Sequence, residues 1–494
     1  MADELILTVY ALTLVGLSLF ALHRVKMVWL YWKHLRRVST PSPAPLPLGT
    51  RVCVQCPLYN EPLVVERLLE CVTRLRWEPG ALEIQVLDDS TDATPEIIDR
   101  WLRQHPVQAV IVKHVRRPER VGYKAGALAY GMTLTKAEFF AVFDADFRPE
   151  PDFLETLMPH FQESRVGVVQ ARWEFSNRAA SLLTRFQAIF LDAHFVVEQA
   201  ARAAGGLYFN FNGTAGIWRR TALEDAGGWT SDTVTEDLDA SYRAQLRGWK
   251  FVYLDRYAVP SELPENLTAF KSQQRRWTKG GVQVARKLLA TVMRSNVPAR
   301  VKREAFSHLT VGFVHPLLIL FSILFVPYLL LLLHSPSGVW LVLNPVTVLL
   351  TGGFTVAFYM TGQYFRQRRW LEGLTWLVVS PFFLAFGLAM SVTCCVAVVE
   401  GLISRGGEFV RTPKGGRAIS AAGLVSRFRS RTWFMAIIAA EFLLGLAMLG
   451  GALHFGRHEM LALSAVLVVK AAGFLTMAAV SSQDLFPRSV PARI

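Results

Sequence analysis

The chain has 494 residues, of which 52% are hydrophobic and only 19% are charged. This balance excludes an intrinsically disordered chain, and the length predicts two or three structural units. The formal net charge is +14, but the basic residues gather in acid-free runs at 24–37, 271–303 and 411–431, each beside an apolar segment. Basic runs beside membrane segments meet anionic headgroups, so membrane lipids, and not nucleic acid, are the expected partners of this charge.

The N-terminal region predicts a permanent membrane helix. Residues 5–22 are uncharged and long enough to cross a bilayer. Asp3 and Glu4 precede them and basic residues follow, which is the reverse of a cleaved signal peptide. We therefore expect the N-terminus outside and the following chain in the cytoplasm. With the Pro-rich linker behind it, this helix makes residues 1–47 the first unit.

Residues 48–290 predict a cytoplasmic α/β domain, because short apolar strands alternate with amphipathic helices. The expected strands cover residues 51–59, 82–89, 109–115, 138–146 and 166–173. Strand–helix alternation favours a mostly parallel, Rossmann-like sheet, and such sheets bind their ligands at the carboxyl ends of the strands.

Residues 291–494 predict interfacial helices followed by a membrane region. Four segments each suit one crossing, namely 309–333, 339–361, 433–452 and 460–480. Residues 371–400 are apolar but contain Pro381, and they fit one long helix, a kinked hairpin or an interfacial helix. If the α/β domain and the basic loop at 405–431 share the cytoplasmic side, this segment cannot cross an odd number of times. That parity favours the hairpin or the interfacial helix.

Four polar motifs follow the ends of the expected strands. They are PLYNEP at 57–62, DDSTD at 88–92, KAGA at 124–127 and DAD at 144–146. Two carboxylates spaced i, i+2 can share a divalent cation whose other ligands are diphosphate oxygens. A lysine can offset phosphate charge, and a tyrosine can stack on a base. Each motif alone arises by chance, since acids at strand ends often cap helices.

The order of the motifs is more specific than any one of them. FNGT at 211–214, TED at 235–237 and QQRRW at 273–277 follow the first four. The series D, DxD, TED, QxxRW resembles the membrane-embedded family 2 glycosyltransferases with a GT-A fold, which include cellulose, hyaluronan and mannan synthases. Stretches such as FNGTAGIWRR and TEDLDASYRAQLRGWKFVYL are most similar to the cellulose synthase-like mannan and glucan synthases of plants.

The resemblance implies a nucleotide-sugar site built from these motifs. Asp144 and Asp146 would bind the diphosphate through Mg²⁺ or Mn²⁺. The residues implied to contact the nucleotide sugar are Tyr59, Glu61, Asp89, Lys124, Asp144, Gln273 and Arg276. A further stretch, EFVRTPKG, lies in the segment 405–418 and resembles the F-x-V-T-P-K gating loop of processive synthases, although Arg411 departs from the pattern. It would add Thr412 and Lys414 to the nucleotide contacts.

Asp237 would be the general base, because inversion at an anomeric carbon requires the attacking sugar hydroxyl to lose its proton. The resemblance implies that Arg276 and the metal stabilise the departing diphosphate. The implied acceptor contacts are Phe211, Asn212, Glu236 and Trp277, and Gln273 would also orient the terminal acceptor sugar. A purely structural interpretation makes the TED acids first-turn residues of a helix and Trp277 an interfacial anchor.

Three functions compete. The first is an inverting, processive glycosyltransferase of the inner or plasma membrane, which takes UDP-glucose, the preferred donor, or GDP-mannose from the cytoplasm, extends a β-linked polysaccharide and moves it across the membrane. Accessory export proteins are compatible with that function. The second is a glycosyltransferase that adds a single sugar to a membrane lipid such as diacylglycerol. The third, a receptor or transporter, has no need of both a DxD and a TED motif.

Overall fold

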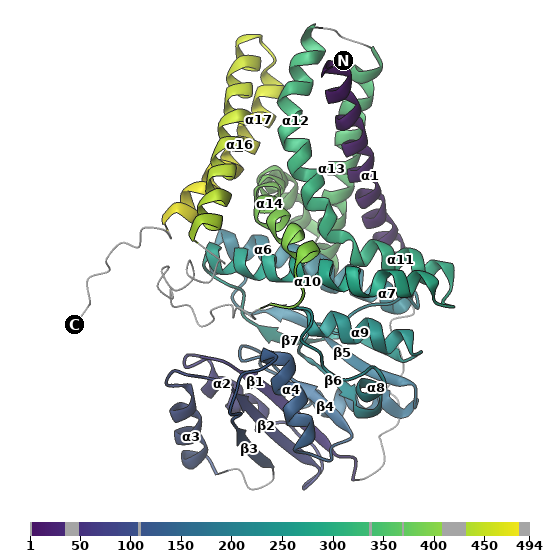
Figure 1. Cartoon of the computed structure of the whole chain (residues 1–494), viewed down its shortest axis with the longest axis vertical. Helices are drawn as coiled ribbons and strands as arrows, with labels where there is room; N and C mark the ends of the chain where they lie inside the picture. The colour runs from purple at the N-terminus through teal and green to yellow at the C-terminus, as the bar shows by residue number, and fades with distance from the viewer. Residues whose placement is uncertain are drawn as a thin grey trace, which may run out of the picture.

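The computed structural model describes residues 2–34, 49–106, 110–334, 338–367, 370–407 and 431–483. It places an α/β domain beneath a bundle of long helices, with two horizontal helices, α6 and α10, between them (Figure 1). Along the chain a helix comes first, then the α/β domain, then the helical region.

A seven-stranded sheet forms the α/β domain, with the strand order β3-β2-β1-β4-β6-β5-β7. Its strands are β1 (Val52–Leu58), β2 (Leu82–Asp88), β3 (Ile111–Val115), β4 (Phe139–Val142), β5 (Val166–Phe175), β6 (Gly216–Arg219) and β7 (Lys250–Ser261). The first five confirm the predicted strands. The neighbours β3, β2, β1 and β4 pair in parallel, as do β5 and β7, while β6 runs antiparallel to both β4 and β5. The sheet is the mostly parallel, Rossmann-like sheet of a GT-A fold.

Both faces of this sheet are buried under helices. Side chains alternate between the faces along a strand, so Val54 of β1 joins one apolar cluster and Cys53 joins the other. The helices of the domain are α2 (Val65–Val72), α3 (Thr94–Gln104), α4 (Tyr123–Thr133), α5 (Phe153–Leu157), η1 (Met158–Gln162), α8 (Arg220–Asp225) and α9 (Glu236–Leu246). Because helices cover both faces, the sheet is accessible to a ligand at the carboxyl ends of β1, β2 and β4.

A second group of helices connects the domain to the bundle. It consists of α6 (Leu182–Asp192), the π-helix η2 (Ala193–Gln199), α7 (Ala200–Ala204), α10 (Leu267–Arg294), α11 (Ala299–Leu309) and η3 (Val311–Phe313). The long helices of the bundle are α1 (Ala2–His34), α12 (Val314–His334), α13 (Gly338–Gln367), α14 (Trp370–Ile403), α16 (Arg431–Arg457) and α17 (Leu461–Gln483).

Five helices of the described chain are long and apolar enough to cross a membrane, so the chain is a membrane protein. They are Asp3–His34, Val311–Leu333, Trp376–Ile403, Thr432–Arg457 and Leu461–Gln483. The first is longer than the predicted 5–22, because His23 and Lys26 both bind the buried Glu304 carboxylate of α11 and the helix continues past the apolar stretch. The segment 339–361 lies within α13, and its crossing stays a prediction.

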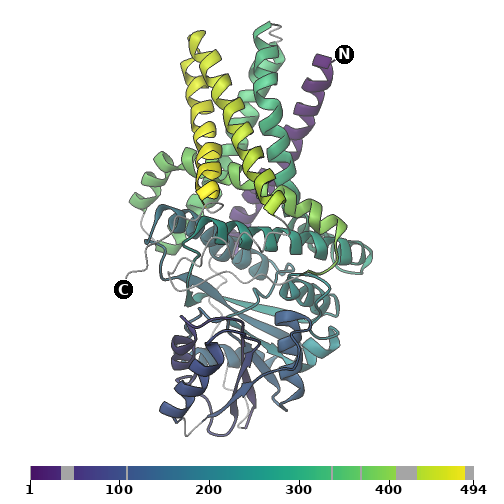
Figure 2. The ribbon, with the colours of Figure 1, turned by 60° about the vertical axis from the view of Figure 1, so that its left-hand side comes forward.

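Residues 371–400 form one continuous helix, α14, so the hairpin alternative is wrong. Pro381 lies inside the helix, which packs closely against α10, α12 and α17. Such neighbours let a membrane helix tolerate proline. In Figure 1 the view is partly along the axis of α14, while α1, α12, α16 and α17 stand upright, and Figure 2 shows the same bundle turned by 60°. One long helix was among the three expected alternatives, and it is the one observed; whether α14 crosses the membrane or lies at its interface stays a prediction.

Candidate active site

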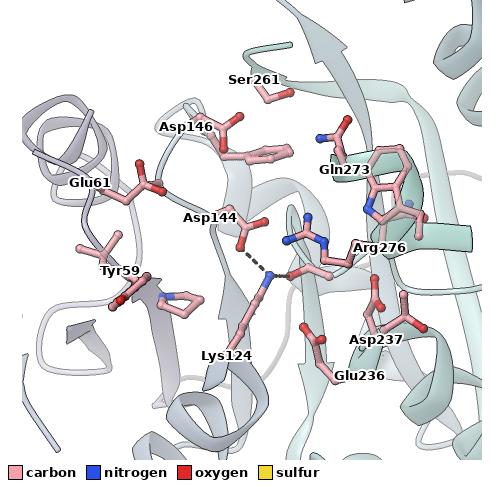
Figure 3. A pocket seen from close by; sticks show the side chains of 18 of the residues that line it. Tyr59, Glu61, Lys124, Asp144, Asp146, Glu236, Asp237, Ser261, Gln273 and Arg276 are labelled. Carbon is pink, nitrogen blue, oxygen red and sulfur yellow. Dashed lines mark hydrogen bonds and ion pairs between the residues drawn. The ribbon is translucent and has the colours of Figure 1, made fainter. Parts of the chain in front are cut away.

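A cavity of about 140 Å³ lies at the carboxyl ends of β1, β2 and β4. Figure 3 shows that side chains from both the α/β domain and α10 converge on it. The predicted site residues that line it are Tyr59, Glu61, Asp89, Lys124, Asp144, Asp146, Asn212, Glu236, Asp237, Gln273, Arg276 and Trp277. The motifs are thus brought together from residues far apart in the sequence, at the sheet edge where the sequence placed them.

The loop after β1 is held by the loop after β2. Asn60 adopts a left-handed conformation, with φ of 58°, and its backbone N–H donates to the Ser90 hydroxyl at 2.8 Å. The backbone N–H of Thr91 donates to the Asn60 side-chain oxygen, also at 2.8 Å. Asparagine tolerates this conformation better than most residues. The turn presents Tyr59 and Glu61 on either side of Asn60 to the cavity.

Two arginines that the motif analysis missed complete this part of the site. Arg117 donates to both carboxylate oxygens of Asp89, at 2.8 and 2.6 Å. Arg120 lies over the Tyr59 ring, 3.4 Å from its centroid, and lines the cavity. Both come from the run KHVRRPER, whose only sequence signal is a concentration of charge before the KAGA motif.

Lys124 connects three of the predicted motifs. Its ammonium donates to Asp144 Oδ1 at 2.5 Å and to the Gly213 carbonyl at 2.9 Å (Figure 3). Burial lowers the pKa of Lys124, but the neighbouring Asp144 and Glu236 carboxylates outweigh it and the net direction is upward. Gly213 has φ of +80°, and a Cβ there would lie 3.0 Å from Asp237 Oδ2. Only glycine suits this position, because both the backbone conformation and the close approach of Asp237 exclude a side chain.

The DAD motif provides a partly exposed carboxylate and a buried one. The Asp144 side chain keeps 35% of its surface exposed, whereas Asp146 is buried and accepts from the Glu262 backbone N–H at 3.1 Å. Among the described residues no cluster of three or more His, Cys, Asp or Glu side chains could hold a metal unaided. Mg²⁺ and Mn²⁺ need only one or two carboxylates when phosphate oxygens complete the shell, so this pair fits a metal that arrives with a nucleotide diphosphate.

The TED motif begins helix α9 and presents two adjacent carboxylates to the cavity (Figure 3). Burial, and then the neighbouring Glu236 carboxylate, raise the pKa of Asp237 to about 7. Burial also raises the pKa of Glu236. A carboxyl group with a pKa near neutrality is suited to accept a proton during a reaction at physiological pH.

Helix α10 supplies the opposite wall. Its first turn is capped by the Asn266 side chain, which accepts from the backbone N–H groups of Thr268 and Ala269. Gln273, Arg276 and Trp277 are spaced i, i+3, i+4 and therefore project from one face of the helix into the cavity. Burial lowers the pKa of Arg276, whereas the nearby Glu236, Asp144 and Asp237 carboxylates oppose this shift.

Asn212 lines the cavity, but Phe211 does not. Phe211 is fully buried in the core of the domain, where its ring packs against Trp218 and Trp229. The expectation that Phe211 contacts the acceptor is therefore wrong, because alternate residues of this extended segment face opposite sides. Thr412 and Lys414 lie outside the described residues.

A second cavity, of about 420 Å³, adjoins the first. Both are lined by Trp173, Leu191, Asn212, Thr235, Asp237 and Trp277, so the two meet at the proposed base and the QxxRW tryptophan. The second continues between helices of the bundle, where its walls include Phe20 of α1, Tyr359 of α13 and Gly387 of α14. Trp173 carries no motif signal, and only the fold places it at this junction.

Comparisons with known proteins define the class. The profile of glycosyl transferase family group 2 matches residues 139–475. Glucomannan 4-beta-mannosyltransferase 7 of Arabidopsis thaliana is 34% identical over 415 residues, which are 80% of this chain and 70% of that protein. Probable glucomannan 4-beta-mannosyltransferase 3 of Oryza sativa subsp. japonica is 36% identical over 397 residues, 77% of this chain and 69% of that protein.

The fold also matches a solved structure, that of the mannosyltransferase PcManGT from Pyrobaculum calidifontis in complex with GDP-Man and Mn²⁺. The TM-score is 0.55 at 21% identity, and the match covers 80% of this chain and 99% of the other. The protein described here is a glycosyltransferase. It belongs to glycosyl transferase family group 2 and is similar to the cellulose synthase-like enzymes of plants.

Proposed function

We propose that the protein is an inverting, processive glycosyltransferase that extends a β-linked polysaccharide and passes the growing chain into its membrane helices. The observation that carries this proposal is the second cavity, which begins at Asp237 and Trp277 and continues between helices α1, α13 and α14. An enzyme that adds one sugar to a soluble acceptor needs no such continuation into the helical bundle, and the product analysis below separates a polymer from a lipid acceptor that would enter by the same route.

The donor would lie in the first cavity as a nucleotide sugar. Tyr59 and Glu61 would hold the base and ribose, Asp89 would act with its Arg117 partner, and Lys124 would meet the phosphates. Two relatives are glucomannan 4-beta-mannosyltransferases, which favours GDP-mannose over the UDP-glucose preferred from sequence. Mg²⁺ or Mn²⁺ would be held by Asp144 and Asp146 and would neutralise charge on the leaving diphosphate. The neighbour of similar fold was solved with GDP-Man and Mn²⁺, which agrees with this donor and metal.

Asp237 would remove the proton from the attacking hydroxyl of the acceptor. It lines both cavities and is thus positioned where donor and acceptor meet, while Glu236 lines only the first. The raised pKa of Asp237 makes it a stronger base than an exposed aspartate. Arg276, across the same cavity, is a fixed cation that would stabilise the departing diphosphate.

The acceptor chain would lie across Trp277 with its reactive end at Asp237. An indole face suits the apolar face of a sugar ring, and Gln273 and Asn212 can hydrogen-bond its hydroxyl groups. Among the described residues, Asn212 Nδ2 and Gln273 Oε1 are buried without a hydrogen-bond partner. Buried polar atoms rarely stay unpaired in proteins, so these two atoms support a polar ligand at the junction.

Product analysis of the full-length protein in liposomes tests the proposal. The protein is supplied with labelled GDP-mannose or UDP-glucose and with Mg²⁺ or Mn²⁺, and the label is followed into two fractions. Ethanol-insoluble, mannanase-sensitive material made from GDP-mannose is the expected result, whereas cellulase-sensitive polymer made from UDP-glucose would replace the donor and keep the processive mechanism. Label only in an organic-extractable lipid would overturn the processive mechanism and support single transfer to a lipid acceptor.

Sealed membrane vesicles from cells that express the protein test where it would act. The proposed location is the inner or plasma membrane, with the α/β domain on the cytoplasmic side and the N-terminus outside. Protease added to right-side-out vesicles from cells that express the protein should spare the α/β domain and cleave an N-terminal tag. Cleavage within the α/β domain of sealed vesicles would reverse this topology.

A further inference from the structure

An ion pair buried inside the helical bundle connects the catalytic helix α10 to the C-terminal hairpin of α16 and α17. The Lys271 ammonium donates to Glu441 Oε1 of α16 at 2.6 Å and to the Ser481 hydroxyl of α17 at 2.7 Å. All three residues are fully buried. One lysine thus contacts both helices of the hairpin.

The contacts around this ion pair are apolar. Leu267, one turn before Lys271, and Phe270, its immediate neighbour, belong to the same buried cluster as Phe434, Phe474 and Met477 of the hairpin. Apolar contacts are nondirectional and tolerate sliding of one helix along another. A buried ion pair carries a large desolvation cost, and its best-attested benefit is that it fixes one arrangement of the groups around it.

Lys271 lies on the opposite side of α10 from the acceptor-binding residues. At 3.6 residues per turn, Gln273 and Trp277 are rotated from Lys271 by about 200° and 240° around the helix. The turn of α10 that enters the active site is therefore held between the cavity on one side and the hairpin on the other. A shift of α10 along the hairpin would move Gln273, Arg276 and Trp277 relative to Asp237.

We propose that the Lys271–Glu441–Ser481 contact is a positioning device that holds the acceptor-binding turn of α10 in place, so that chain elongation depends on the C-terminal hairpin. The inference rests on the proposed function, because it assigns acceptor binding to α10. Lys271 and Glu441 touch neither cavity and act through Gln273 and Trp277. Their loss should impair elongation while leaving donor binding intact.

Three variants of the full-length protein in liposomes test this. Lys271→Met and Glu441→Leu each leave one buried charge unpaired, and the double variant replaces the pair by apolar side chains. Each single variant should elongate at least tenfold more slowly than wild type with labelled GDP-mannose, while its dissociation constant for GDP stays within twofold. The double variant should return to within about threefold of the wild-type elongation rate.

Lys470→Met is the matched control. Lys470 is a lysine of the hairpin that is only partly buried, and its ammonium lies over the Phe321 and Phe325 rings of α12, at 4.5 and 3.5 Å, and not near α10. Lys470→Met should change the elongation rate less than twofold. A loss as large as that of Lys271→Met would mean that removing any lysine ammonium from inside the bundle slows elongation, and would overturn the positioning role.

Other outcomes are equally decisive. The inference would be overturned if the single variants elongate at the wild-type rate. It would also be overturned if their GDP affinity falls as much as their elongation rate, or if the double variant elongates no faster than the single variants. If the single variants do not insert, Ser481→Ala removes one hydrogen bond without leaving a charge unpaired, and it should slow elongation two- to fivefold; no change would overturn the proposal. If the wild-type protein transfers only single sugars, the proposed function fails. The Lys271–Glu441–Ser481 contact is then tested separately, by comparing the acceptor KM for single transfer between wild type and the single variants.

Discussion

At the scale of single residues, the paired carboxylates of the TED motif should set the pH dependence of the enzyme. Burial and Glu236 raise the pKa of Asp237 to about 7, and a general base must be ionised to act. As pH falls below 7, protonation of Asp237 removes the base, so kcat/KM should drop about tenfold per pH unit. A pH–rate profile between pH 5 and 9 measures this. A profile that stays flat down to pH 5 would exclude Asp237 as the base.

The neighbouring residue gives a second test with a defined sign. Because the Glu236 carboxylate raises the pKa of Asp237, its replacement by the neutral Gln should lower that pKa. The acidic limb of the Glu236→Gln profile should therefore move to lower pH, even if the maximal rate also falls. Asp237→Asn removes the base and should reduce transfer by at least about 100-fold while GDP still binds. A limb that moves to higher pH in Glu236→Gln would contradict the proposed coupling.

Trp277 offers a test that separates acceptor binding from donor chemistry. Trp277→Ala removes the flat surface at the junction of the two cavities, so elongation should fall at least tenfold, while hydrolysis of the donor by water should change little. Product length and free sugar release are measured in parallel. Trp173→Phe replaces the indole at the same junction by a smaller aromatic ring, so its elongation rate should fall less than that of Trp277→Ala. Unchanged polymer length in Trp277→Ala would remove its proposed role.

Single-residue predictions from sequence succeeded where a motif fixes both residue type and position. Asp144 and Asp146 follow a buried strand, and their place at the sheet edge follows from that alone. Arg120 and Trp173 could not be found this way, because each reaches the site only through tertiary packing. Phe211 shows the reverse error, since a residue adjacent to a site residue in an extended segment faces the other side.

At the scale of elements, the close packing of α10 against the TED turn should be intolerant of added volume. A Cβ on Gly280 would lie 2.3 Å from Thr235 Cγ2, so Gly280→Ala should displace α10 or the TED turn and reduce transfer at least tenfold. Gly281→Ala is the matched control for packing, since a Cβ there meets no atom within 4 Å, and alanine favours the helix by up to about 1 kcal/mol. Because Gly281 lines the second cavity, donor hydrolysis is compared as well as elongation. Initial rates and thermal stability of both variants are compared. Equal rates would show that this contact does not position the catalytic turn.

The elements show why some structure was predictable and some was not. The five strands confirmed from sequence are apolar runs that end in polar motifs, so periodicity and boundary signals agree. Strand β7 was missed because it is only partly buried and mixes charged with apolar residues, as in KFVYLDRYAVPS. For α14, proline and a parity argument favoured a hairpin or an interfacial helix, but packing against α10 and α17 supports a continuous helix. The sequence pattern predicts local structure, whereas the pairing of β7 and the continuity of α14 depend on the elements that pack against them.

At the scale of the whole molecule, polar contacts join the α/β domain and its connecting helices to the helical bundle. Arg366 of α13 donates to Glu174 of β5 at 2.9 Å, and Gln363 donates to the buried Asp192 of α6 at 2.8 Å. On the other side, Glu304 of α11 accepts from Lys26 of α1 at 2.6 Å. An intact junction between domain and bundle is what a growing chain would need to pass from the catalytic centre into the membrane region.

Filling the second cavity tests whether the chain takes this path. Met390 of α14 is buried and lines that cavity, so Met390→Trp should occupy space that the polysaccharide needs, while the donor site is untouched. Polymer length should fall at least tenfold, with donor hydrolysis within about threefold of wild type; Met390→Leu keeps the volume and should elongate normally. Size-exclusion analysis of labelled product and release of free sugar measure the two activities. Full-length polymer from a stably folded Met390→Trp enzyme would show that the product leaves by another route. If Met390→Leu also loses both elongation and donor hydrolysis, Met390 is needed for packing and its role is not in passage of the chain.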